Sequence, residues 1–273
     1  MSMMESLFNI LFSLCCGFGT GTLSGLLGIG GGMIMVPLFC LVFNMSPLSA
    51  TATSLFVIIL TSVFGTITHL YHKTCLLRIG LITGLSGAPV AFFSARIARY
   101  TPNWLIVLVT ALIIMYSAIH MLKGTDIFGK YTENNKHSHI KQTSSWQHMS
   151  SLRTAVLSSI IGLIAGFFSG FSGVGGGFIM VPFFVNFLQM DMKMTSGTSL
   201  LAILFIAVTG SIQRALFGHI AFLPGLNMGI AAIPGAILGS HLVRKVPERT
   251  LKIVFSCLLI ICAIMLIGKQ VIH

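Results

Sequence analysis

No Asp, Glu, Lys, Arg or His occurs from Ser6 to Thr68, a run of 63 residues. About 20 apolar residues are enough for a helix to cross a bilayer, so this run alone predicts more than one crossing. Further runs without these residues cover 154–190, 194–213 and 220–240. Only 8% of the chain is charged, against about a quarter in a typical soluble protein. These features predict an all-α polytopic membrane protein whose surroundings are the lipid bilayer.

The net charge of +11 would suggest nucleic acid as a partner for a soluble protein. Here the basic residues sit in short connections between apolar segments, which is the topology signal of membrane proteins. We therefore expect no nucleic-acid partner. Only Glu5 precedes the apolar run that begins at Leu7, so the basic lead-in of a signal peptide is missing and we expect this run in the mature protein.

The sequence repeats itself at an offset of 145 residues. Residues 17–102 align with 162–247 without a gap, and 28 of the 86 positions are identical. The phrase GLLGIGGGMIMVPLF begins at Gly25, and GFSGVGGGFIMVPFF begins at Gly170. Shared hydrophobicity does not keep Gly, Pro and Arg in register, so the chain is a duplication. We predict a first transmembrane repeat at 1–122, a polar basic linker at 123–151 and a second repeat at 152–273.

The linker is the one long hydrophilic stretch, and its composition is typical of disorder. Its histidines, His137, His139 and His148, do not have the spacing of a compact metal site. The six cysteines are scattered, mostly inside apolar segments, and include no CxxC pair. We expect no resident metal and no cofactor.

Each half contains about four hydrophobic segments, eight in total. In the first half they are 7–43, 46–69, 76–95 and 103–122, and in the second 154–189, 193–214, 220–241 and 250–268. The first segment of each half is interrupted, by GIGGG or by GVGGG. It is either one long broken crossing or a hairpin with the glycines at its tip.

The distribution of Lys and Arg favours the hairpin. Parallel halves divide the 16 basic residues 9 to 7, whereas hairpins and inverted halves divide them 12 to 4. Because basic connections stay in the cytoplasm, we predict inverted repeats with both termini outside. Broken helices of inverted repeats often meet near the membrane midplane and form the substrate site of secondary transporters.

The glycine clusters are therefore the candidate substrate site. Backbone groups at such breaks must be buried in protein or face a wet cavity, and the helix that restarts there directs free N–H groups toward the break, which suits an anion. A simple sharp turn is the structural alternative. The predicted site glycines are Gly28, Gly30, Gly31, Gly32, Gly173, Gly175, Gly176 and Gly177.

Other glycines have a packing role. Gly17, Gly21 and Gly25, with their repeat partners Gly162, Gly166 and Gly170, recur every four residues, the spacing that allows close contact between helices. Pro37 and Pro182 are expected to kink the returning arm of each hairpin and are candidates for gating.

Polar residues of the following segment complete the candidate site. The hydroxyls of Thr53, Ser54, Thr198 and Ser199 either donate to an anion or bond their own helix. His69 and Arg214 occupy equivalent positions near the end of this segment. Either could guide an anion, His69 could carry a proton, or both could anchor the helix at the membrane interface.

The doubled GxGGGxxxVP phrase, the ATS and GTS triplets ending at Ser54 and Ser199, and the basic connection that begins near His69 resemble the TauE/SafE sulfite exporter family. The resemblance covers nearly the whole chain apart from the central insert. It implies transport of a small sulfur-containing or organic anion, such as sulfite, a sulfonate or sulfoacetate, across the bacterial inner membrane.

We predict a permease that moves a small anion by alternating access. No acidic residue lies inside an expected segment, which argues against a cation pump, and no HExxH, GxSxG or P-loop pattern suggests an enzyme. A soft-metal transporter is an alternative because of the run MDMKM at 190–194, and a scaffold without transport is another. A homo-oligomer is compatible with the glycine spacing.

Overall fold

The computed structural model describes residues 3–132, 151–218 and 220–272, and these residues form helices and connections with no strand among them. The first half contains α1 (Met3–Leu27), α2 (Gly32–Leu41), α3 (Pro47–Tyr71), α4 (Leu77–Tyr100) and α5 (Asn103–Thr132). The second half contains α6 (Ser151–Ser172), α7 (Gly177–Phe187), α8 (Met192–Ala215), α9 (Phe222–Leu242) and α10 (Glu248–Ile272). The predicted all-α class is confirmed.

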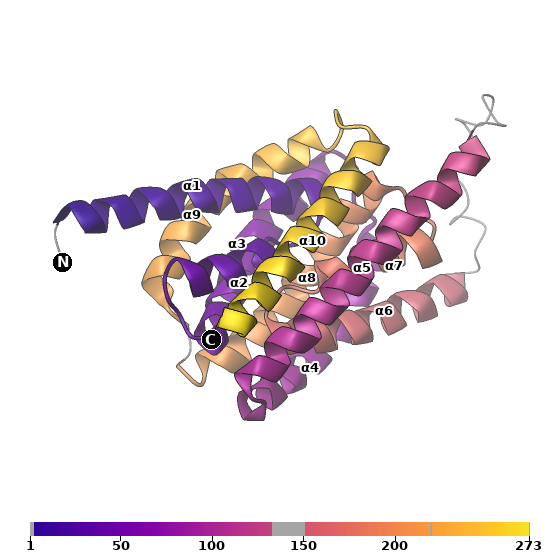
Figure 1. The fold of residues 1–273 in the computed structure, drawn as a ribbon. Coiled ribbons are helices and arrows are strands. Elements are labelled where there is room, and N and C mark those ends of the chain that lie inside the picture. The colour runs from indigo at the N-terminus through magenta and orange to yellow at the C-terminus, as the bar shows by residue number, and fades with distance from the viewer. Residues whose placement is uncertain (1–2, 133–150, 219, 273) are drawn as a thin grey trace.

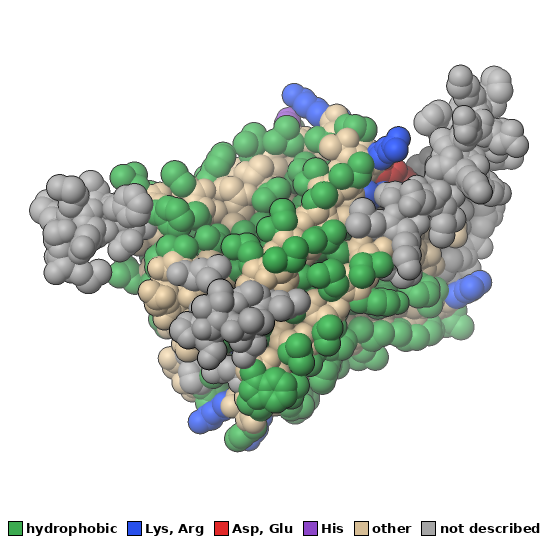
Figure 2. Space-filling view, in the orientation of Figure 1, with side chains coloured by type: hydrophobic (Ala, Val, Ile, Leu, Met, Phe, Trp, Pro, Cys, Tyr) green, Lys and Arg blue, Asp and Glu red, His purple; other side chains and the backbone are tan. Residues whose placement is uncertain are grey.

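Hydrophobic helices and an apolar surface identify a multi-pass membrane protein. Within the described residues, α3, α4, α8, α9 and most of α6 are long and apolar enough to cross a bilayer. Shorter apolar stretches lie in α1, α5 and α7. Figure 2 shows hydrophobic side chains over the middle of the visible face, with Lys and Arg gathered at opposite edges.

The two halves pack on each other in a reciprocal way. Helix α1 of the first half lies along α9 of the second, and α6 of the second half lies along α4 of the first (Figure 1). Helices α3 and α8, which occupy equivalent places in the repeat, also contact each other, as do α5 and α10. Exchanging the halves leaves this pattern unchanged, as expected for a duplicated chain. Their inverted orientation in the bilayer remains a prediction from the charges.

Glycines make the reciprocal contacts close. A methyl group at Gly21 of α1 would lie 2.2 Å from the carbonyl oxygen of Ala232 in α9, and one at Gly166 of α6 would lie 2.3 Å from that of Gly87 in α4. Real side chains do not approach a backbone oxygen so closely. The same holds for the glycines one turn before and after, so the packing role predicted for these six glycines is confirmed.

The last helix of the first half continues past residue 122, where we expect the first repeat to end. Helix α5 continues to Thr132, so the linker predicted at 123–151 begins as helix. The three linker histidines, His137, His139 and His148, lie outside the described residues.

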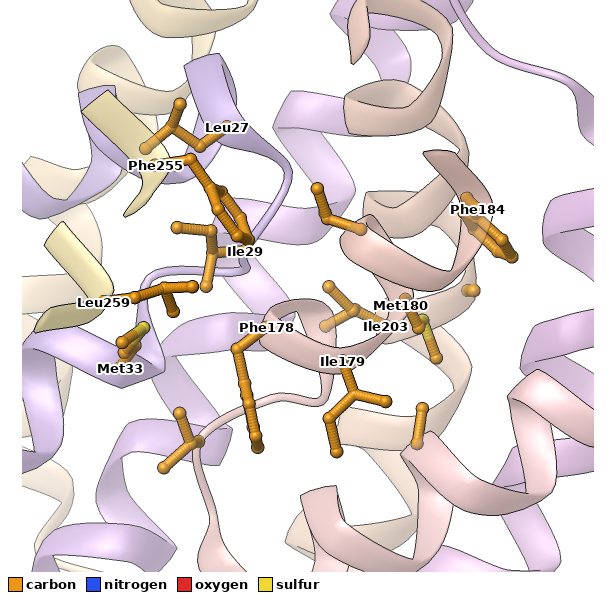
Figure 3. Packing of buried hydrophobic residues seen from close by; sticks show 14 of the residues in the cluster. Leu27, Ile29, Met33, Phe178, Ile179, Met180, Phe184, Ile203, Phe255 and Leu259 are labelled. Atoms are coloured by element: carbon orange, nitrogen blue, oxygen red, sulfur yellow. The ribbon is translucent and has the colours of Figure 1, made fainter. Parts of the chain in front are cut away.

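The main hydrophobic core surrounds the breaks in the two long segments. It includes Leu27, Ile29 and Met33 from the first break, and Phe178 just after the second. Figure 3 shows Leu27 and Ile29 beside Phe255 of α10, Met33 beside Leu259 of α10, and Phe178 on the side of Ile203 of α8. Each break is therefore placed at the centre of the protein by its own apolar neighbours.

Candidate functional site

The chain reverses direction at each glycine cluster. We name residues 28–31 the first tip and residues 173–176 the second tip. A methyl group at Gly31 would lie 3.6 Å from the carbonyl oxygen of Thr20 and 3.4 Å from Cβ of Ser24, both in α1. A continuous helix would separate residues 20 and 31 by roughly 16 Å along its axis. The predicted glycine-broken hairpins are therefore present.

Glycine is needed at both tips for the backbone conformation. Gly28, Gly30 and Gly31 have φ angles of 75°, 82° and 81°, and Gly173, Gly175 and Gly176 have 70°, 97° and 70°. These angles lie in the left-handed region, which L residues other than Asn and Asp rarely adopt. Both tips therefore make the same backbone turn.

The two tips touch each other at the centre of the protein. A methyl group at Gly32 would lie 2.7 Å from the carbonyl oxygen of Val174, and one at Gly177 would lie 2.7 Å from that of Gly28. Ile58 of α3 and Ile203 of α8, which are repeat partners, pack beside them. The tips are buried, so in this conformation neither tip is exposed at the protein surface.

Each tip ends at an open helix N-terminus. Gly31 caps α2 and Gly176 caps α7, and neither helix has a side-chain hydrogen bond at its cap. The first N–H groups of a helix have no acceptor within it, and they carry the positive end of the helix dipole. Two such ends, one from each half, lie at the contact between the tips. This arrangement can attract a small anion.

Serine hydroxyls tie each tip to the opposite half. The hydroxyl of Ser54 donates to the carbonyl oxygen of Gly173 at 2.6 Å, and that of Ser199 donates to the carbonyl of Gly28 at 2.7 Å. Each hydroxyl oxygen also lies near a carbonyl oxygen of its own helix, at 2.9 Å for Ser54 and 3.0 Å for Ser199, with which its single hydrogen can be shared. Both serines are fully buried. Their hydroxyls hold the tip backbone in this conformation rather than pointing into an open site.

The neighbouring threonines hold helix starts. Thr53 Oγ1 accepts a 3.0 Å hydrogen bond from the N–H of Ala221, the residue that caps α9. Thr198 Oγ1 accepts one of 3.0 Å from the N–H of Leu76, the residue that caps α4. The threonines therefore lie beside connections in the opposite half, away from the tips.

His69 and Arg214 contact backbone carbonyls at the C-terminal ends of α1 and α6, which are the long arms of the two hairpins. His69 Nε2 lies 2.9 Å from the carbonyl oxygen of Gly25 in α1. The Arg214 guanidinium donates at 2.7 Å to the equivalent carbonyl, that of Gly170 in α6, and at 3.1 Å to the carbonyl of Phe171. Cations and N–H donors suit the negative end of a helix. Both side chains are buried, so the interfacial-anchor interpretation is wrong.

Arg214 also carries a buried charge whose hydrogen-bond partners are neutral. Besides the two α6 carbonyls, its guanidinium donates to Thr51 Oγ1 and to the carbonyl of Leu48 at 3.5 Å. Its Nε has no partner among the described residues. A buried cation with neutral partners favours the approach of an anion.

The prolines do not end the helices α2 and α7, which are the short arms of the two hairpins. Pro37 lies inside α2 and Pro182 inside α7, and both helices continue beyond them. Both prolines are buried. Because proline has no N–H, one carbonyl in each short arm loses its helical hydrogen bond.

Sequence reasoning missed three hydroxyls beside the tips. Thr61 donates to the carbonyl oxygen of Gly30 at 3.0 Å, and its repeat partner Ile206 has no hydroxyl to do the same. Ser24 and Ser169, which are repeat partners, are buried and their hydroxyls have no partner among the described residues. Their identity at equivalent positions was the signal that could have marked them.

Known proteins resemble this chain along almost its whole length. The model of the family described as Sulfite exporter TauE/SafE matches residues 13–266. The probable membrane transporter protein YunE of Bacillus subtilis is 28% identical over 268 residues, which cover 94% of this chain and 95% of that protein.

Other organisms carry similar proteins. A probable membrane transporter protein of Xylella fastidiosa (strain 9a5c) is 25% identical over 96% of both chains, and MJ0441 of Methanocaldococcus jannaschii is 23% identical over 93% of this chain and 94% of its own. No solved structure matches the chain. Because the family model spans nearly all of its described helices, the chain belongs to the sulfite exporter TauE/SafE family.

Proposed function

We propose that this protein is a permease that moves a small anion, of the sulfite, sulfonate or sulfoacetate class, across the bacterial inner membrane by alternating access. One observation carries the proposal: two helix N-termini without side-chain caps, one from each half, meet in the buried centre. N–H groups and helix dipoles directed at one point favour negative charge. Family membership adds support for a sulfur-containing anion.

The buried guanidinium of Arg214 supports an anion rather than a cation. It lies against α6 within one turn of the second tip and its hydrogen-bond partners carry no charge. A metal cation near this group would be repelled. The soft-metal alternative is also weakened because Met190 and Met192 lie in the main hydrophobic core, where they fill volume.

Contacts between the halves support alternating access. The tips are joined to the opposite half by the Ser54 and Ser199 hydrogen bonds, and the halves are related by a reciprocal pattern of packing. Rocking one half against the other would break one of these hydrogen bonds and open one side of the tip contact. The serines are then conformational latches, and the N–H groups of α2 and α7 are the substrate ligands.

A pair of variants at each tip tests the anion site. Asn and Asp have the same size and both tolerate positive φ, but Asp places a negative charge where the anion would bind. We expect proteoliposomes with Gly31→Asn or Gly176→Asn to retain part of the flux of radiolabelled sulfite and sulfoacetate. Gly31→Asp and Gly176→Asp should abolish it.

Controls make the comparison specific. Gly19 in α1 has open space around it, so Gly19→Asn and Gly19→Asp report the general cost of a polar residue in the membrane. Equal flux through the Asn and Asp variants of folded protein would show that the tips do not bind an anion. A native protein that moves neither sulfur compound would contradict the substrate class.

A further inference from the structure

One face of α3 is polar and buried, and its hydroxyls lack partners. Ser62 is fully buried and Thr66 is 4% exposed, and neither hydroxyl has a hydrogen-bond partner among the described residues. This is unusual because a helical Ser or Thr can bond a carbonyl one turn earlier, as Thr68 does with Phe64 at 2.9 Å. Buried polar groups without protein partners are normally satisfied by water or by a ligand.

This face connects the first tip with the end of the helix. Ile58, Ser62, Thr66 and His69 are separated by four, four and three residues, so they lie along one side of α3. Ile58 packs against Gly32 at the tip contact, and His69 bonds the long arm α1. The two unpartnered hydroxyls therefore lie between the first tip and the C-terminal end of α3.

Polar groups also continue from this face toward the tip itself. The unpartnered hydroxyl of Ser24 belongs to α1, one residue before the Gly25 carbonyl that His69 bonds. Cβ of Ser24 lies 3.4 Å from the methyl position of Gly31, the cap of α2. A buried hydroxyl without a partner thus lies at the open helix N-terminus of the first tip.

Two histidines and an arginine cluster at the C-terminal end of the same face. His72 follows His69 by three residues, and its Nε2 lies 2.8 Å from Nδ1 of His241. Arg244 approaches Nδ1 of His72 at 3.2 Å. His241 and Arg244 are exposed. The positive charge of Arg244 at the mouth of a route raises the local concentration of anions.

The equivalent face of the second half lacks the hydroxyl of Ser62. The repeat partners of Ile58, Ser62 and Thr66 are Ile203, Ala207 and Ser211. The place of His69 is taken by Arg214, whose guanidinium is already engaged with four oxygen atoms. The second half keeps hydroxyls at Ser169 and Ser211, but the continuous row that includes position 62 is found in the first half.

We propose that Ser62, Thr66 and Ser24 line a hydrated route by which the anion travels between the His72–His241–Arg244 cluster and the first tip. Water and then the substrate satisfy the hydroxyls that the protein leaves without partners. The choice of an anion as the cargo of this route rests on the proposed permease function. The hydration of the route does not depend on that function. The charge distribution predicts that it opens to the cytoplasm, the side on which Lys73 and Arg244 are expected.

Cysteine labelling tests the route. In a variant without the native cysteines, Ser62→Cys and Thr66→Cys would be treated with 2-sulfonatoethyl methanethiosulfonate, an anionic reagent that does not cross membranes. Only the thiolate reacts, and it forms in water. Ile67→Cys, on the exposed and apolar side of α3, and Ala207→Cys, the repeat partner of position 62, are matched controls. The labelled fraction would be followed by mass spectrometry.

We expect positions 62 and 66 to react at least roughly tenfold faster than positions 67 and 207, and sulfoacetate to slow the reaction. Reaction no faster than at Ile67, in protein that still transports, would overturn the route even if the Gly31→Asp result stands. Rapid labelling that sulfoacetate does not slow, in protein that moves sulfoacetate, would also overturn it, because the anion would travel elsewhere.

A further variant tests the route without a labelling reagent. Thr66→Val keeps the shape of the side chain and removes only the hydroxyl. If Thr66 lines the route, flux falls while thermal stability is kept or rises, because an unpartnered buried hydroxyl is removed. Unchanged flux together with raised stability would mean that the hydroxyl is a packing defect, and the proposal would be wrong.

Discussion

Ser54 in the first half donates its hydroxyl hydrogen to the carbonyl oxygen of Gly173, 119 residues away in the second half, at 2.6 Å. Ser199 makes the reciprocal hydrogen bond to Gly28 at 2.7 Å. Each half thus fixes the glycine tip of the other. A change of conformation at one tip must therefore either break this hydrogen bond or move the α3 or α8 helix that makes it.

Removing either serine hydroxyl should loosen one tip. Ser54→Ala and Ser199→Ala each leave a buried carbonyl with one donor fewer, which should lower the free energy of unfolding by about 1–3 kcal/mol. Thermal unfolding in detergent measures this loss, and flux in proteoliposomes should also fall. Thr68→Ala is the control, since Thr68 bonds only within its own helix. Equal losses of stability and flux in Ser54→Ala, Ser199→Ala and Thr68→Ala would show that the two serines do not hold the tips in a special way.

Arg214 should not be replaceable by lysine. Its planar group reaches the carbonyls of Gly170 and Phe171 and the hydroxyl of Thr51 together, and a lysine ammonium cannot match that geometry. Arg214→Lys should lower the free energy of unfolding by about 1.5–3 kcal/mol, as for lost hydrogen bonds to a charged group. It should also reduce anion flux.

Arg214→His adds a second arm to this experiment, since His69 performs the equivalent contact in the first half. We expect this variant to retain more stability than Arg214→Ala. A stable Arg214→Ala protein with native flux would show that the buried charge serves neither the fold nor transport. Thermal unfolding and flux would again be measured side by side.

A larger side chain at a glycine that contacts the other half should destabilise the protein. Gly166→Val would place Cβ 2.3 Å from the carbonyl of Gly87, so α6 and α4 must move apart. We expect a loss of about 1–3 kcal/mol, as for overpacking of a well-packed core, measured as a lower unfolding temperature in detergent. Gly19→Val, in open space, should have little effect. A stable Gly166 variant would contradict the close packing.

Acid should weaken the cluster at the end of α3. Partial burial, and then the nearby His241 and Arg244, lower the pKa of His72 below its ordinary value. The folded protein therefore binds fewer protons at His72 than the unfolded chain, so this contribution to stability is present above about pH 6.5 and is lost as the pH falls toward the lowered pKa.

His72→Phe tests this dependence, because phenylalanine is the repeat partner at position 217 and also lies under an arginine, with Arg99 4.3 Å from its ring centre. Between about pH 7.5 and 5.5, the unfolding temperature of the native protein should fall more than that of the variant. Parallel pH profiles for the two proteins would mean that His72 does not titrate in this range.

Much of the fold could be predicted because it depends on local pattern. Long charge-free runs predicted the helices, and the register of the repeat predicted two equivalent halves and both glycine breaks. The spacing of Gly17, Gly21 and Gly25 predicted a close helix contact. The partner of that contact, α9, could not be predicted, because apolar helices in a membrane offer many equivalent neighbours and sequence spacing does not choose among them.

The candidate site was predicted only in part. The turn at the glycines followed from their conformational freedom, but the cross-half hydrogen bonds of Ser54 and Ser199 join residues more than a hundred positions apart. The face formed by Ser62 and Thr66 was missed because its signal is a hydroxyl without a partner, which no sequence displays. The difference between Thr61 and Ile206 was visible in the repeat and could have marked the first tip as special.

The reciprocal packing of α1 on α9 and of α6 on α4 has a consequence for any shorter chain. A chain of half this length would leave the glycine face of its first helix uncovered unless a second copy packed on it. Two identical half-length copies could cover these faces for each other, in the way that the two halves of this chain do. The halves now differ at equivalent positions, with His69 in the first and Arg214 in the second.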